Sequence, residues 1–183
     1  METMEDFRSM LTGGHPNSLG RTLEVVDAVL ETPARLEELY NCYFSDDEIV
    51  RLRTSNAIRR IFKARKEWFA DYADRLLDEI SQIDQPSTKW TLAQLWLEHR
   101  SRLTPAQQVR AKENLVKTLL EEDDWIALNM SMKTLERFTK DDQQLIARIA
   151  DRTREIAHDN RKSVSKGAMT LLNAMNEPVD LLK

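Results

Sequence analysis

The chain has 183 residues, of which 41% are hydrophobic and 32% are charged, and its formal net charge is −4. This length suits one domain with a core of its own, and the mild acidity argues against a dedicated nucleic-acid binder. The single cysteine, Cys42, excludes an internal disulfide and a cysteine-cluster metal site. Low contents of Gly and Pro favour helices over strands or disorder.

No apolar stretch reaches the roughly 20 residues that a membrane-spanning helix needs. The start METMEDFRSML lacks the basic and apolar segments of a secretory signal. We therefore expect a soluble, cytoplasmic protein without a membrane partner.

Helical periodicity, broken at short intervals, runs through most of the chain. Residues 4–11 could form two helical turns, but Gly13, Gly14 and Pro16 interrupt them, so we expect residues 1–20 to be a mobile arm unless they dock. Residues 21–183 are expected to form a single domain. Capping residues and prolines divide this domain into helices over about 21–31, 33–44, 48–66, 68–82, 87–100, 105–121, 125–138, 142–157 and 161–176.

An aspartate recurs in the turn within each of four helix pairs, at intervals of 38, 39 and 36 residues. A bulky apolar residue follows twelve positions after each aspartate, and mostly small residues precede it by three or four positions. The small residues would allow the paired helices to approach closely. Self-similarity at this period is typical of helical repeat proteins. The turn aspartates are Asp46, Asp84, Asp123 and Asp159, and the bulky residues are Ile58, Trp96, Leu135 and Leu171.

The segment DDEIVRLRTSNAIRRI resembles a HEAT-type repeat, with Asp46, Val50, Arg51 and Ile58 at the matching positions. The second copy keeps Asp84 and Lys89 but has Thr88 in place of Val. The third and fourth copies carry Leu128 and Val164 where a basic residue is usual. The resemblance covers residues 34–176 and extends to bacterial HEAT-like proteins of unassigned activity.

This resemblance implies an all-α fold, a right-handed α-α superhelix that forms a short solenoid of about four antiparallel helix pairs. An up-down helix bundle and an armadillo-like array are the alternatives. The resemblance also implies structural roles for Asp46, Arg51, Asp84, Lys89, Asp123 and Asp159. We expect the Arg51 guanidinium to pair with a turn carboxylate, for which Asp46, Asp47 and Asp84 are candidates.

In HEAT-like arrays the second helices of the pairs line the concave face. The solvent-side positions on these helices carry six basic residues and one acid, Glu98, and the basic residues could bind an acidic peptide or, through phosphate, a nucleic acid. The other interpretation is an ordinary solvated surface. The candidate binding residues on this ridge are Arg53, Asn56, Arg60, Lys63, Gln94, Lys133, Arg137 and Lys166.

Trp90 and Trp125 lie near repeat ends, where an aromatic side chain could anchor a partner or pack in the core. The three histidines have no partner at metal-ligand spacing, and the sequence contains no catalytic triad, nucleotide fingerprint or zinc pattern. We therefore predict no catalytic residue, no metal and no cofactor.

The leading functional hypothesis is a non-enzymatic scaffold that presents a partly basic concave groove to a protein or peptide. A DNA-binding protein comes second, because some HEAT-like DNA-alkylation-repair proteins hold DNA on such a face. An enzyme or enzyme subunit comes third.

Overall fold

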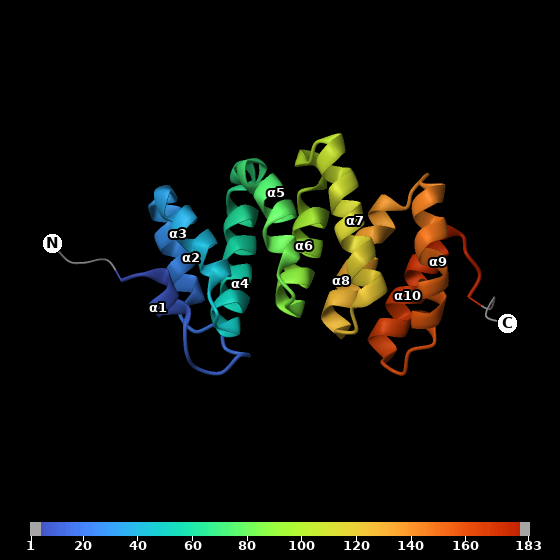
Figure 1. Cartoon of the computed structure of the whole chain (residues 1–183), viewed down its shortest axis with the longest axis horizontal. Helices are drawn as coiled ribbons and strands as arrows, with labels where there is room; N and C mark the ends of the chain where they lie inside the picture. The colour runs from blue at the N-terminus through green and yellow to red at the C-terminus, as the bar shows by residue number, and fades with distance from the viewer. Residues whose placement is uncertain (1–4, 180–183) are drawn as a thin grey trace. The chain divides into compact units, whose positions relative to one another are not determined.

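A computed structural model describes residues 5–179, and all regular structure among these residues is helical (Figure 1). The prediction of an all-α fold is confirmed. The α-helices are α1 (Phe7–Leu11), α2 (Thr22–Glu31), α3 (Leu36–Asn41), α4 (Glu48–Ala64), α5 (Phe69–Asp78), α6 (Pro86–Glu98), α7 (Pro105–Glu121), α8 (Trp125–Phe138), α9 (Gln143–Ala157) and α10 (Lys162–Met175). Short 3-10 helices are η1 (Pro33–Arg35), η2 (Cys42–Phe44), η3 (Lys66–Trp68), η4 (Ile80–Gln82) and η5 (Arg100–Arg102).

The helix starts follow from their capping residues. Thr104 and Gln107 form a capping box at the start of α7, with Pro105 at the first helical position. The Asp124 carboxylate accepts hydrogen bonds from two backbone N–H groups at the start of α8, and Asp142 caps α9 through the N–H of Leu145. These caps satisfy backbone donors that would otherwise lack partners.

The chain divides within α5 into two compact units, Met1–Tyr72 and Ala73–Lys183. In the first unit α2 and α3 pack on α4. Its core includes Val25, Tyr40, Val50 and Ile58, which are all fully buried. A single domain over 21–183 stays a prediction.

The amino-terminal segment docks on the first unit. Helix α1 contacts α2, α3 and α4, and Phe7 and Leu11 are fully buried. The backbone N–H of Phe7 donates to the Glu38 carboxylate at 2.8 Å, and Arg35 lies over the Phe7 ring. The segment therefore adds apolar core to this unit. Residues 1–4 of the predicted arm and 180–183 of the predicted domain lie outside the described residues.

The second unit has two helical layers (Figure 1). Helices α6, α8 and α10 form one layer, because α8 packs against both α6 and α10. Helices α7 and α9 pack on each other in the other layer, and also on α8 and α10 respectively. The three residues between α7 and α8 force these helices to run in opposite directions. This arrangement is compatible with a helical repeat fold.

Small residues lie between the second helices of successive pairs. A Cβ atom on Gly167 would be only 2.6 Å from Asn129 Oδ1, so α8 and α10 approach closely there. Between α6 and α8, the buried Thr134 hydroxyl donates to the Ala93 carbonyl at 2.8 Å. The sequence predicted close approach at the small positions within each helix pair. In the second unit, Ala93 and Gly167 lie instead at the contacts of α8 with α6 and α10.

Candidate functional site

The turn aspartates are spaced as the repeat predicts, but the helix cap is often the following residue. Asp46 is exposed, and Asp47 caps α4 by accepting from the Ile49 N–H at 2.8 Å. In the third copy Asp124 is the cap. The adjacent Asp123 accepts instead from Arg161, the residue before α10. The recurring carboxylate therefore binds a cation in this copy and does not cap the helix.

Two cations link successive turns of the second unit. Lys89 lies 2.6 Å from Asp84 and 2.7 Å from Glu122, and Arg161 bridges Asp159 and Asp123. Hydrogen bonds from the Arg161 side chain and backbone lower the pKa of Asp159 to about 2. Burial of Glu122 acts to raise the pKa of its carboxyl, but the hydrogen bond from Lys89 and two backbone N–H groups outweigh burial and lower it.

Arg51 is half-buried and its Nη1 donates to the Ser45 carbonyl at 2.5 Å. Burial acts to raise the pKa of Asp47, but hydrogen bonds from Thr12 and from backbone N–H groups, together with the positive charge of Arg51, outweigh burial and lower it. Arg51 therefore contacts the turn that precedes α4 through a backbone carbonyl, and its pairing with a turn carboxylate stays a prediction.

Arg53 is only 2% exposed, although the register predicts it on the solvent side. Its guanidinium donates to the carbonyls of Leu11 at 2.7 Å and Gly13 at 2.6 Å. Longer hydrogen bonds run to other carbonyls of the segment, those of Thr12, His15 and Ser18. The charge of Arg53 is thus used inside the first unit, where it holds residues 11–18 against α4.

The other ridge residues of the first unit lie on α4. Arg60 is exposed and its Nε donates to the Asn56 side chain at 2.7 Å, and Lys63 is exposed near the end of the helix. These two cations have access to a ligand.

The ridge residues of the second unit lie on the layer of α6, α8 and α10. Gln94 of α6 contacts Met130 of α8, with Nε2 and Sδ 3.2 Å apart. Lys133 and Arg137 follow on the exposed side of α8, and Lys166 is exposed on α10. We call the surface formed by Gln94, Met130, Lys133, Arg137 and Lys166 the basic face. Helices α7 and α9 pack on this layer, and Arg137 lines a hollow together with Glu98 of α6 and Gln108 of α7.

Among residues 5–179, Lys133, Arg137 and Lys166 make no ion pair. On the layer of α7 and α9, three cations are paired across helices. Arg110 contacts Asp74 and Asp78. Lys112 contacts Asp142, and Arg148 forms a bidentate pair with Glu113. Three cations on the layer of α7 and α9 are therefore neutralised by carboxylates, whereas Lys133, Arg137 and Lys166 are not.

The two candidate aromatic anchors differ in exposure. Trp125 is the first residue of α8 and is 51% exposed, whereas Trp90 on α6 is half-buried. On α10, Met169 is 45% exposed and follows Lys166 by three residues, so apolar surface accompanies the cations. Trp125 is accessible enough to contact a partner at the turn end of the layer.

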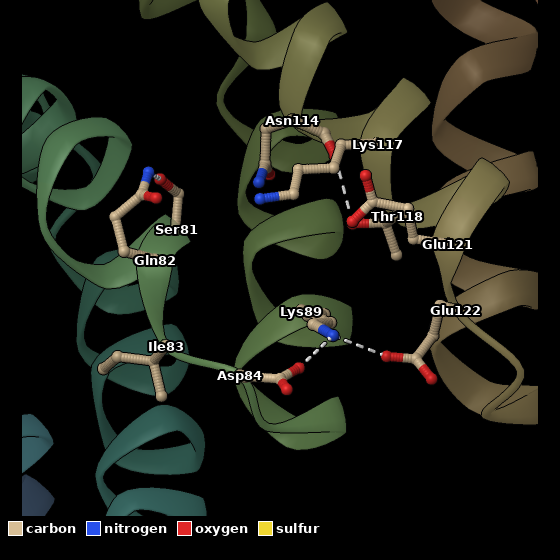
Figure 2. Close-up of a pocket in the computed structure, with 10 residues that line it drawn as sticks. All are labelled: Ser81, Gln82, Ile83, Asp84, Lys89, Asn114, Lys117, Thr118, Glu121 and Glu122. Atoms are coloured by element: carbon tan, nitrogen blue, oxygen red, sulfur yellow. Dashed lines mark hydrogen bonds and ion pairs between the residues drawn. The ribbon is translucent and has the colours of Figure 1, made fainter.

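A separate polar cleft of about 280 Å³ lies at the turn end of the second unit (Figure 2). Its walls come from η4, the start of α6 and the last turns of α7. Lys89, Asp84 and Glu122 form one end. Asn114 and Lys117 of α7 line the cleft further along, and no sequence motif indicated these two residues.

Metal-ligating side chains and the single cysteine are also candidates for a functional site. No cluster of three or more His, Cys, Asp or Glu side chains there could hold a metal ion. Burial and the nearby carboxylate of Glu38 raise the pKa of the Cys42 thiol to about 11, so the reactive thiolate is scarce near neutral pH. Within residues 5–179, no helix combines the length and the apolar character needed to cross a bilayer.

No protein-family model, curated protein or solved structure matches the chain.

Proposed function

We propose that the chain is a short HEAT-like α-solenoid that acts as a non-enzymatic scaffold or binding protein. Its basic face would take an acidic, partly apolar helical segment of a protein or peptide partner. The packing of α6, α8 and α10 in one layer supports the repeat architecture, because second helices of HEAT-like pairs form such a layer. The buried free thiol of Cys42 suits the reducing cytoplasm.

The observation that carries this proposal is the contrast between the two layers of the second unit. Lys133 and Arg137 are four residues apart on α8, a spacing at which like charges repel by roughly 0.2–0.5 kcal/mol. A carboxylate nearby would remove this cost, as it does on the other layer. The basic face has none within ion-pair distance among the described residues, so acidic groups of a partner are the complement that it lacks.

Apolar surface beside the cations favours a peptide over nucleic acid. Met130 is half-buried beside Gln94, and Met169 is exposed beside Lys166. Flexible methionine side chains suit the apolar side of an amphipathic helix. Phosphate would use only the cations, and the burial of Arg53 removes one cation from the predicted set.

The test uses a fluorescent amphipathic helical peptide with leucine on one side and glutamate on the other. Wild-type protein should bind it, and K133E/R137E/K166E should weaken binding by about 10-fold or more, since each rim charge is worth up to ~1 kcal/mol. K117E/K140E changes exposed cations off the basic face and is the control. Binding that survives the triple reversal would overturn the proposal. Preference for a single-stranded oligonucleotide over the peptide would favour the DNA-binding alternative.

A further inference from the structure

The polar cleft of the second unit presents hydrogen-bond donors that the fold itself does not use. Asn114 accepts a hydrogen bond at Oδ1 from Trp96 Nε1 at 3.0 Å. Trp96 is fully buried, and an indole N–H can only donate, so this contact fixes which end of the Asn114 amide faces the indole. The NH₂ group must therefore point the other way. No acceptor for it is found among the described residues.

Lys117 continues the donor side of the cleft. It lies three residues after Asn114, on the same side of α7, and both side chains extend toward the wall formed by Ser81 and Gln82 (Figure 2). The Lys117 side chain is exposed and makes no ion pair among residues 5–179. An amide donor and an ammonium group close together suit a carboxylate, which can accept from both.

The rest of the cleft carries the opposite charge. Lys89 is already occupied by Asp84 and Glu122, so that group of three keeps one net negative charge. Glu121 adds a further carboxylate, which forms no ion pair with another described residue. Five charged side chains thus give the cleft a net charge of about −1 near neutral pH. The net negative charge of the cleft repels a simple anion. A molecule that carries both a negative and a positive charge would be attracted through its positive group.

From this arrangement we propose that the cleft binds a small zwitterion of the free amino-acid class. Its carboxylate is held by the Asn114 amide and the Lys117 ammonium group, and its ammonium group faces the carboxylates around Glu121. The cleft volume of about 280 Å³ lies at the low end for ligand pockets and suits a small molecule. This site is separate from the basic face and does not depend on its proposed peptide partner.

The experiment titrates the ¹⁵N-labelled full chain with each of the twenty L-amino acids and follows amide and indole signals by NMR. At least one amino acid should shift the Trp96 indole signal and the amides of the last turns of α7. Acetate and propylamine each carry one of the two charges and should bind more weakly. Equal binding of either compound would overturn the zwitterion assignment, as would no response to any amino acid at about 10 mM, a weak limit for specific binding.

Two substitutions should change ligand affinity at the cleft while leaving the protein folded. Asn114→Asp keeps an oxygen for the Trp96 indole but replaces the NH₂ donor with a carboxylate oxygen, so the affinity should fall by about 10-fold or more. Lys117→Gln should weaken binding by a smaller factor. Asn129→Asp makes the same change outside the cleft and should bind like wild type. Unchanged affinity in folded Asn114→Asp protein would refute the proposal. If Asn114→Asp fails to fold, unchanged affinity in Lys117→Gln would refute it equally.

Discussion

Replacing Arg53 by Met should release the amino-terminal segment and lower the stability of the first unit. The substitution keeps an apolar stem but leaves the carbonyls of Leu11 and Gly13 without their short hydrogen bonds. A buried carbonyl without a partner costs about 1–3 kcal/mol. The hydrogen bond to the Leu11 carbonyl is buried, whereas Gly13 is exposed and water can reach its carbonyl, so only the Leu11 carbonyl is counted. The expected loss is therefore about 1–3 kcal/mol.

For a chain of this size each kcal/mol lowers Tm by roughly 2–4 °C, so Arg53→Met should melt about 2–12 °C below wild type. Hydrogen exchange should also become faster over residues 7–20, because their anchor is gone. Arg60→Met is the matched control, since Arg60 is exposed and its Nε binds only Asn56. The reasoning is refuted if the two variants melt together and exchange in residues 7–20 stays at the wild-type rate.

Three further changes test other contacts. Gly20→Ala should destabilise the chain more than Gly13→Ala in thermal melts: both have positive φ, but only at Gly20 would a Cβ lie 2.8 Å from the Arg53 guanidinium carbon. Lys89→Met should lower stability by about 1 kcal/mol in urea unfolding, because it leaves the half-buried carboxylate of Glu122 without its cation; an unchanged midpoint would argue against the link. The depressed pKa of Asp159 means that its ion pair stabilises the fold above about pH 3.8 and that this stabilisation is lost as the pH falls through about 2. Removing the cation should raise the ¹³C-detected titration midpoint of this carboxyl toward 3.8.

Helix positions could be predicted well because the breaks carry their own chemistry. Thr104 followed by Pro105 predicted the start of α7, and the acidic turn before Trp125 predicted the start of α8. Such caps act over three or four residues, so the sequence displays them directly. The residue within a turn that forms the cap depends on backbone angles, so the spacing of the turn aspartates did not indicate that Asp47 and Asp124 cap their helices.

Arg53 could not be placed from the sequence because its partners are about 40 residues away. A helical wheel counts angles on one helix and puts Arg53 on the solvent side. That side became buried only because Gly13, Gly14 and Gly20 let the amino-terminal segment fold around the guanidinium with positive φ. The Asn114 amide donor of the cleft could not be predicted from the sequence for a similar reason. Nothing in the sequence links Trp96 to Asn114, although this contact orients the amide.

Because Lys133, Arg137 and Lys166 make no ion pair with a described residue, they can be substituted without breaking ion pairs that stabilise the fold. Reversing Arg110 or Arg148 would break cross-helix ion pairs, so any loss of binding could follow from damage to the fold. Reversing Lys133, Arg137 and Lys166 leaves no described carboxylate without a partner. It also removes the mutual repulsion along α8 and replaces it with repulsion of the same order. The free energy of unfolding should therefore change little. A fall in peptide affinity after this reversal then measures the charge complementarity between the basic face and the peptide.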